Sequence, residues 1–252
     1  MPRLMDTEET MQQNGPGAFQ FSGVRVENLG ASEYTLVTMV TDVSGSVGNF
    51  AAQLLETLKS VVEACKQSPR SENLLLRYLT FNEDIVEEHG FRLLGDIDII
   101  KDYKELKPIG MTALFDATYD AIGATVDYSS RLVNDFEFDV NGIVIIVTDG
   151  MNNRGSMTPT SIKDKIDAAL KHEDIESLIT ILVQLKDPKS PYQAEVNQHL
   201  KRFYNDAGLS QFIDVGDATS GALAKLAQFV SQSISSQSQS LGSGSPSQLL
   251  TF

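Results

Sequence analysis

A carboxylate and two hydroxyls stand on alternate residues at Asp42, Ser44 and Ser46, directly after an apolar run and before a helical pattern. Such oxygen donors suit a hard cation such as Mg²⁺ far better than a soft metal. Asp and Ser before a helix are also the usual capping residues, and the segment alone favours a cap over a metal ligand. A metal-binding interpretation therefore requires further donors that converge on the same place.

The flanking patterns define where this segment lies in the fold. Residues 34–40 are apolar and rich in β-branched side chains, which predicts a buried strand, and apolar residues recur at helical spacing from 50 to 65. The segment 42–46 therefore occupies a turn between a strand and a helix. In open α/β sheets such turns, at the carboxyl ends of strands, form the ligand-binding crevice.

Two further junctions carry oxygen donors. Thr112 lies in the segment 110–117, which opens a long helical pattern, and Asp149 ends the run 142–148, the most strand-like segment of the chain. The loops that follow adjacent central strands converge on one crevice of a doubly wound sheet. The donors of the three junctions can therefore share one divalent cation.

Strand and helix patterns alternate along the rest of the chain. Right-handed crossovers between them give an α/β fold with a doubly wound, mainly parallel sheet and helices on both faces. The segments 85–88 and 91–94 favour a hairpin or an edge strand. Other strands are expected at 73–81, 177–185 and 211–215, and helices at 48–67, 97–106, 158–172, 191–207 and 220–235.

We expect one folded domain over residues 21–236, because no internal repeat or interior linker interrupts the pattern. Residues 1–20 are polar, lack a period and end in turn formers, which predicts a flexible amino-terminal arm. Residues 237–252 have the Ser, Gln and Gly composition of a flexible linker and predict a disordered tail. The apolar residues Leu249, Leu250 and Phe252 close that tail, so a docking peptide for self-association is the alternative.

Composition limits the class of partner and the compartment. The net charge is −14, from 20 basic and 34 acidic residues without a basic cluster, which disfavours nucleic acid and anionic membranes. The single cysteine, Cys65, lies on the apolar side of the first helix and is expected to be buried. The amino terminus lacks the apolar core of a signal peptide, and no run has the ~18 apolar residues that span a bilayer. These features predict a soluble, cytoplasmic protein.

Three segments together resemble the metal-ion-dependent adhesion site (MIDAS) of von Willebrand factor A (VWA) domains. They are Asp-Val-Ser-Gly-Ser at 42–46, Gly-Met-Thr-Ala-Leu at 110–114 and Thr-Asp-Gly at 148–150, which match in order, spacing and placement after apolar strands. The similarity covers residues 32–235. It implies a Rossmann-like α/β domain with one short antiparallel strand near Phe91.

The same resemblance implies a set of metal ligands. Ser44, Ser46 and Thr112 would bind Mg²⁺ or Mn²⁺ directly, and Asp42 and Asp149 would bind the ion or hold waters in its outer shell. Two carboxylates only neutralise a divalent ion, so an open coordination position remains electrophilic towards an Asp or Glu of a protein partner. We therefore expect a cation-dependent protein-binding scaffold and not an enzyme.

The layout of the whole chain suggests a setting. A free-standing A domain with a Ser/Gln/Gly-rich tail is similar to intracellular bacterial and phage VWA proteins of the tellurite-resistance type, which implies a role in stress response. The alternative function is a Mg²⁺-dependent hydrolase of phosphoesters, which an open cation in a crevice can support. The chain has no Gly-x-x-x-x-Gly-Lys-Ser/Thr loop, however, and Asp42 is followed by Val-Ser and not by the second Asp of a dehalogenase-type phosphatase.

Several other polar residues are left out of the predicted site. The histidines His89, His172 and His199 have no metal-ligand spacing and are expected to be solvated surface residues. Asp116 and Asp120 fit the polar face of their helix. The predicted site therefore contains only the donors of the three junctions.

Overall fold

The computed structural model describes residues 8–13, 19–187 and 190–252. The strands are β1 (Glu8–Gln13), β2 (Phe19–Val24), β3 (Glu33–Asp42), β4 (Leu74–Phe81), β5 (Ile85–Leu93), β6 (Asp139–Thr148), β7 (Ser177–Lys186) and β8 (Gln211–Asp217). The α-helices are α1 (Ala51–Lys66), α2 (Leu114–Phe136), α3 (Pro159–Lys171), α4 (Gln193–Asp206) and α5 (Ser220–Ser243). Short 3-10 helices are η1 (Val26–Asn28), η2 (Gly45–Asn49), η3 (Ser71–Asn73) and η4 (Leu94–Asp96).

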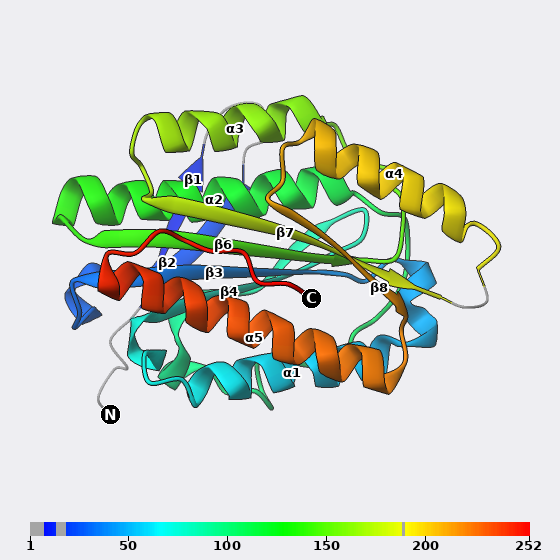
Figure 1. Cartoon of the computed structure of the whole chain (residues 1–252), viewed down its shortest axis with the longest axis horizontal. Helices are drawn as coiled ribbons and strands as arrows, with labels where there is room; N and C mark the ends of the chain where they lie inside the picture. Colours follow the sequence, from blue (N-terminus) through cyan, green and yellow to red (C-terminus); the bar gives the residue numbers. More distant parts are fainter. Residues whose placement is uncertain (1–7, 14–18, 188–189) are drawn as a thin grey trace.

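These strands form one sheet in the order β1-β2-β5-β4-β3-β6-β7-β8 (Figure 1). Strands β4, β3, β6, β7 and β8 run parallel, whereas β5 is antiparallel to β4 and β1 is antiparallel to β2. The predicted mainly parallel α/β architecture is confirmed, and the antiparallel strand expected near Phe91 is β5. It is not the last strand, because β2 and β1 extend the sheet beyond it.

Helices cover both faces of the sheet. Figure 1 shows α1 and α5 on one face and α2, α3 and α4 on the other. From β3 the chain passes through α1 to β4 on one side, and β6 later pairs with β3 on its other side. The strand order thus reverses between β3 and β6, and the crevice beyond their carboxyl ends is the topological switch point where such folds bind ligands.

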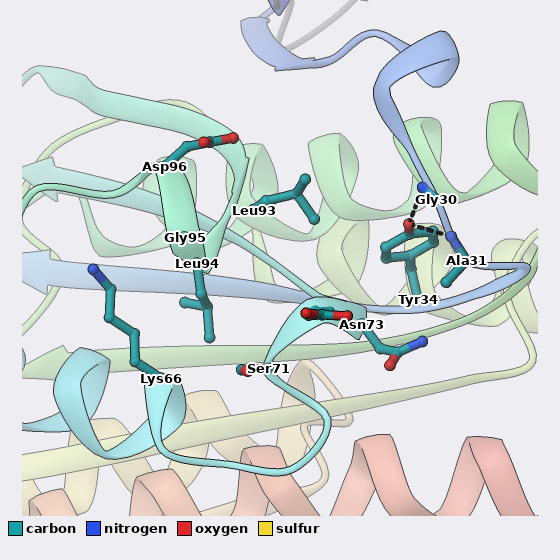
Figure 2. Close-up of a pocket in the computed structure, with 11 residues that line it drawn as sticks. Gly30, Ala31, Tyr34, Lys66, Ser71, Asn73, Leu93, Leu94, Gly95 and Asp96 are labelled. Carbon is teal, nitrogen blue, oxygen red and sulfur yellow. Dashed lines mark hydrogen bonds between the residues drawn. The ribbon is translucent and has the colours of Figure 1, made fainter.

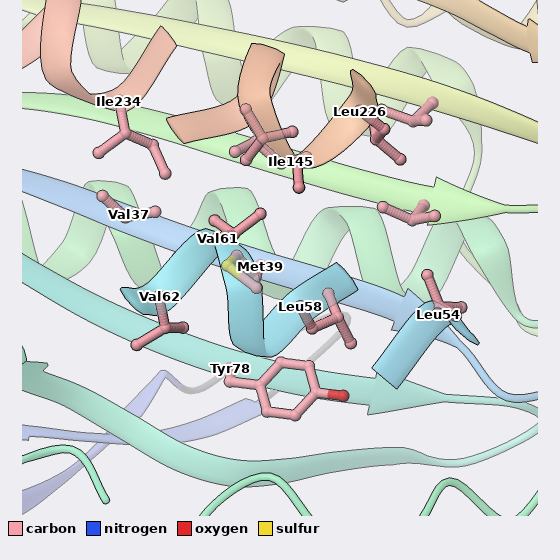
Figure 3. Packing of buried hydrophobic residues seen from close by; sticks show 14 of the residues in the cluster. Val37, Met39, Leu54, Leu58, Val61, Val62, Tyr78, Ile145, Leu226 and Ile234 are labelled. Atoms are coloured by element: carbon pink, nitrogen blue, oxygen red, sulfur yellow. The ribbon is translucent and has the colours of Figure 1, made fainter. Parts of the chain in front are cut away.

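The core lies on both faces of the central strands. On β3, Val37 and Met39 pack in the cluster beneath α1 and α5, and Val40 packs in the cluster beneath α2 and α3. Figure 3 shows the first of these clusters. Cys65 of α1 is buried in the same cluster, as predicted. Of the helices that the structure describes, none has the length and hydrophobicity needed to cross a lipid bilayer.

The amino-terminal residues differ from the expected flexible arm. Residues 8–13 form β1 and pair with β2 along its whole length. The pairing is anchored because Phe19 and Phe21 of β2 are buried, and Glu8 forms an ion pair with Arg92 of β5 at 2.6 Å. The remaining residues of the predicted arm, 1–7 and 14–18, lie outside the described part of the chain.

The carboxyl-terminal residues also differ from the prediction. Helix α5 continues to Ser243, so the expected domain end at residue 236 falls inside a helix. The segment after the helix returns to the same domain, where Gln237 donates to the carbonyl of Gln248 at 3.1 Å and Phe252 packs edge-on against Phe229. Leu250 and Phe252, which the alternative interpretation would dock on a second copy, pack against the core of their own chain, whereas Leu249 is exposed.

Residues 97–106 form turns and not the predicted helix. Ile97 and Tyr103 are buried, which explains the apolar pattern. The carboxylate of Asp98 accepts the backbone N–H groups of Ile100 and Lys101. Such side-chain bonds compete with the hydrogen bonds of a helix and stabilise the turn instead.

Candidate metal centre

Asp42 is the last residue of β3 and its side chain is fully buried. Its Oδ1 accepts the backbone N–H of Ser44 at 2.7 Å, and its Oδ2 accepts the hydroxyl of Thr148 at 2.6 Å. Both oxygens are therefore held in place, and each retains a lone pair for a further interaction. The neighbouring strands β3 and β6 thus position this carboxylate at the switch point.

The two serine hydroxyls are not used as helix caps. Ser44 precedes the 3-10 helix η2 but its side chain makes no capping hydrogen bond. Its Oγ lies 3.3 Å from the Oγ of Ser46, whose hydroxyl donates to Oδ1 of Asp149 at 2.8 Å. The donors of the loops after β3 and β6 are thus joined in one network. The capping alternative that the sequence left open does not describe these side chains.

Thr112 is buried just before α2 and is fastened to the loop after β6. Its backbone N–H donates to Oδ1 of Asn153 at 2.8 Å, and its carbonyl accepts the N–H of Asn153 at 3.0 Å. Next to it, Asn152 Oδ1 accepts the N–H of Phe115 at 3.0 Å. Sequence reasoning missed both asparagines, although two adjacent Asn residues after Asp149-Gly150 were a visible signal for loop contacts of this kind.

The donors surround one small space next to Gly150. A β-carbon at this glycine would lie 3.4 Å from Thr112 Oγ1 and 3.9 Å from both Asp42 Oδ2 and Ser46 Oγ. Ser44 and Asp149 join the group through their hydrogen-bonding contacts with Ser46. The structure therefore brings together the five residues that the sequence selected.

The chemistry of this donor set fits Mg²⁺ or Mn²⁺. All of its side-chain donors are hard oxygens, and the two carboxylates match the charge of a divalent ion. Over residues 8–13, 19–187 and 190–252 no group of three His, Cys, Asp or Glu side chains is arranged to hold a metal. The candidate site therefore depends on its hydroxyls as much as on its carboxylates.

Replacing Gly150 with alanine is expected to block the candidate site. The added methyl group would occupy the space between the donors at ordinary contact distances of 3.4–3.9 Å, so the fold should tolerate it. Mg²⁺ affinity should fall at least about tenfold, as expected when the surroundings of a metal site are disturbed. Calorimetric titration with MgCl₂ measures this, and Gly30→Ala, where a β-carbon meets open space, is the matched control. Equal affinity of Gly150→Ala and the unaltered protein would contradict the placement.

The surroundings of both carboxylates disfavour their ionised forms in the absence of a cation. Burial raises the pKa of Asp42, and burial together with the charge of Asp42 raises the pKa of Asp149 to about 7. The hydrogen bond from Ser46 lowers the pKa of Asp149, but by less than these two effects raise it. A divalent cation would offset the negative charge that burial disfavours.

This raised pKa predicts a pH-dependent difference between the protein and its Asp149→Asn variant in EDTA. When the pKa of a carboxyl group is higher in the folded than in the unfolded state, its contribution to stability is fully present below the unfolded pKa. This contribution is lost as the pH rises through the folded pKa of about 7. Asp149→Asn should therefore be the more stable protein at high pH, by roughly 1–3 kcal/mol, with a smaller gap at low pH. Urea unfolding on both sides of the folded pKa measures the gap, and a gap that widens at the lower pH would contradict the electrostatic account.

A further polar group lies beside the site. Gln184 of β7 lines a cavity of about 50 Å³ together with Ser46 and Asp149. Its Oε1 accepts from Asn197 at 2.8 Å, and no residue of the described segments accepts a hydrogen bond from its Nε2. Sequence reasoning also missed Gln184, because its side chain reaches this place only through the pairing of β7 with β6.

The two aspartates left out of the predicted site have structural contacts. Asp116 accepts the backbone N–H groups of Ser156 and Met157 and so fixes the far end of the loop after β6. Asp120 does not lie on an exposed polar face, because it is buried and pairs with Arg77 at 2.9 Å. Neither carboxylate is among the donors that surround Gly150.

The expectation of three solvated histidines is correct only for His172, which is exposed. His89 is buried on β5, where its ring lies edge-on to Tyr103. His199 of α4 stacks on Phe115, and its Nε2 accepts the N–H of Asn152 at 3.2 Å. His199 thus supports the loop that carries Asp149.

Another hollow lies at the opposite end of the parallel strands. Figure 2 shows this cavity of about 720 Å³, which is lined by Tyr34, Lys66, Asn73 and other residues. The hydroxyl of Tyr34 accepts the N–H groups of Gly30 and Ala31, and Lys66 donates to a backbone carbonyl. These groups are satisfied within the chain and lie at the other end of β3 from the candidate metal centre.

Solved structures share the fold. The PilB minor pilin from Streptococcus sanguinis is 13% identical over 89% of this chain and 66% of its own, with a TM-score of 0.57. The pilus adhesin SpaC from Lactobacillus rhamnosus GG is 11% identical over 91% of this chain and 34% of its own, with a TM-score of 0.56. Proximal thread matrix protein 1 from the mussel byssus is 19% identical over 81% of this chain and 47% of its own, with a TM-score of 0.52.

The chain spans less than two thirds of each of these longer proteins. The sequence matches no protein-family model and no curated protein. At such identities the comparisons establish a shared fold. The chain thus shares the α/β fold of these structures, with the selected oxygen donors gathered at the switch point of its sheet.

Proposed function

We propose that this chain is a divalent-cation-dependent protein-binding module. Its candidate site would hold Mg²⁺ or Mn²⁺ and bind a carboxylate of a partner protein. The observation that carries the proposal is the space next to Gly150, which Thr112, Asp42 and Ser46 approach from three separate segments. Oxygen donors from three segments at a topological switch point are what a shared cation requires.

Each residue of the site has a role in this proposal. Ser44, Ser46 and Thr112 would bind the ion through neutral oxygens, and Asp42 and Asp149 would offset its charge. When bound, the ion would supply an electrophilic position for a partner's Asp or Glu. The partner's surroundings should be basic, because this chain carries a net charge of −14.

The names of the structural neighbours support an adhesive role, since two of them are a minor pilin and a pilus adhesin. A cytoplasmic scaffold in a stress response, which the sequence layout implies, remains the other setting of the same module. Both settings use the site in the same way. The proposal therefore concerns the binding chemistry and leaves the setting as a separate prediction.

Capture of partners from a lysate of the source cells tests the proposal. Protein with Mg²⁺ should retain partners that EDTA releases and that the Thr112→Val variant fails to retain. Valine keeps the shape of Thr112 but removes the hydroxyl, so the fold is preserved. The matched control is Thr118→Val. Thr118 is also buried, and its hydroxyl donates to the carbonyl of Leu114. A set of captured proteins that neither EDTA nor Thr112→Val changes would contradict the proposal.

The hydrolase alternative has its own test. Phosphoester chemistry needs a positioned water and cationic groups that stabilise the transition state, in addition to a metal ion. We expect no turnover of p-nitrophenyl phosphate that depends on both Mg²⁺ and Asp149. Turnover that disappears in Asp149→Asn would favour the hydrolase over the binding module.

A further inference from the structure

Two apolar side chains are exposed beside the candidate metal centre. Ile109 is 68% exposed and Met111 is 48% exposed, on either side of Gly110 in the segment that leads to Thr112. Most apolar side chains of this size lie in the core of the domain. Exposed apolar groups at a functional site are typical of interaction surfaces.

The backbone that carries these side chains is firmly held. Ile109 donates its N–H to the carbonyl of Val43 at 2.9 Å, and its carbonyl accepts from Asn82 Nδ2 at 3.0 Å. The carbonyl of Gly110 accepts the N–H of Gly45 at 3.3 Å. Gly110 has a φ of +82°, which glycine adopts without strain. The exposure of both side chains is therefore built into the fold and requires no rearrangement on binding.

The same contacts place the apolar pair next to the metal donors. Val43 and Gly45 alternate with Asp42, Ser44 and Ser46 along one turn, so the segment 109–111 lies against that turn. A partner residue whose carboxylate reaches the cation would bring its sequence neighbours over Ile109 and Met111. The pair can then bury apolar surface that the carboxylate contact alone would leave in water.

Carboxylates of this chain on both sides of the site restrict which other residues the partner can place there. Glu83 approaches Gly110 closely, since a β-carbon on the glycine would lie 3.4 Å from its carboxylate. On the other side of the site, Asp187 lines a small cavity together with Ser46 and Asp149. A second carboxylate on the partner would be repelled at both places, whereas an apolar or basic residue would be accepted.

On the basis of the proposed function, we propose that the ligand of this module is a protein segment in which an Asp or Glu has an apolar neighbour. The carboxylate would contact the cation, and the apolar neighbour would pack on Ile109 and Met111. Basic residues would follow further out. The cation site together with Ile109 and Met111 would thus bind a segment with an acidic and an apolar residue more tightly than a segment with acidic residues alone.

Selection from a displayed peptide library tests this inference. The library has one fixed Glu and random residues on both sides, and the immobilised full chain is used with Mg²⁺ or with EDTA. Apolar residues next to the Glu should be enriched at least about fivefold in Mg²⁺, the affinity ratio that corresponds to about 1 kcal/mol. The enrichment should disappear with the Ile109→Ser/Met111→Ser variant, and that variant should keep the Mg²⁺ affinity of the unaltered protein.

The control variant is Ile100→Ser, which removes an apolar side chain that is 83% exposed in the turn segment 97–106. It should select the same peptides as the unaltered protein. Enrichment in Mg²⁺ without an apolar preference, or with a preference that survives Ile109→Ser/Met111→Ser, would overturn the inference and leave the proposed function standing. Selection that is identical in Mg²⁺ and EDTA would overturn both.

Discussion

Replacing Asp42 with asparagine should lower the Mg²⁺ affinity at least about 100-fold, because removal of an outer-shell partner alone typically costs 10–100-fold. The substitution removes one of the two carboxylates of the candidate site and leaves the ion only partly neutralised. Asparagine keeps the size of the side chain and can still accept the N–H of Ser44. Because burial raises the pKa of Asp42, the metal-free variant should be at least as stable as the unaltered protein.

A loss of Mg²⁺ affinity without a loss of stability in EDTA distinguishes a metal ligand from an aspartate that only supports the structure. Calorimetric titration with MgCl₂ measures the first effect, and urea unfolding in EDTA measures the second. The control is Asp164→Asn, which removes an exposed carboxylate of α3 and the same formal charge. A variant that loses stability in EDTA and keeps its Mg²⁺ affinity would show that Asp42 only supports the turn.

Replacing Arg77 with methionine should lower the free energy of unfolding by about 3–5 kcal/mol, the usual cost of breaking a buried ion pair from one side. Arg77 lies on β4 with a fully buried side chain and contacts Glu87 at 2.6 Å and Asp120 at 2.9 Å. Glu87 also accepts the N–H and the hydroxyl of Ser22. The arginine thus joins α2, β5 and β2 to the central strands, and its loss leaves two carboxylates without their counter-charge.

Urea unfolding of Arg77→Met measures this cost. Arg92→Met is the comparison, because the Arg92 side chain is 26% exposed and its pairs with Glu8 and Asp102 should contribute no more than about 1 kcal/mol. Adding Asp120→Asn to Arg77→Met should recover part of the loss by removing an uncompensated charge. An equal loss in the free energy of unfolding for Arg77→Met and Arg92→Met would show that burial does not determine the contribution of these ion pairs.

The sequence predicted the architecture well where periodicity was strong. The apolar runs of β3, β4, β6 and β7 are buried on both faces, and this arrangement produces the near-continuous apolar pattern that predicted them. The donors near Gly150 could also be selected, because each follows a strand or precedes a helix in the pattern. Their convergence required only the rule that such loops meet at one edge of the sheet.

The contacts that hold the site could not be predicted in the same way. Asn82 brackets the segment 109–113 by donating to the carbonyl of Ile109 and accepting the N–H of Ala113 at 2.7 Å. Asn153 and His199 likewise act through backbone groups of distant residues. Contacts of this kind depend on the register between elements, which local periodicity does not define.

The terminal segments show the limit of composition as a guide. Ser and Gln near the end of α5 suggested a flexible linker, yet Gln237 and Ser238 are buried there. Ser238 accepts a hydrogen bond from Arg70 at 3.0 Å, so a polar residue has a partner across the fold. A polar stretch can be ordered when its neighbours supply such partners, and only the tertiary structure reveals them.

In our proposal, one divalent cation binds at the switch point with a coordination position open for a ligand. Titration with Mn²⁺, followed by the relaxation of water protons, tests it most directly, because bound Mn²⁺ with an exchangeable water enhances that relaxation. We expect saturable binding of one ion per chain, enhanced relaxation that a ligand carboxylate reduces, and loss of both in Asp42→Asn. Relaxation equal to that of free Mn²⁺ at every protein concentration, or enhancement unchanged in Asp42→Asn, would contradict it.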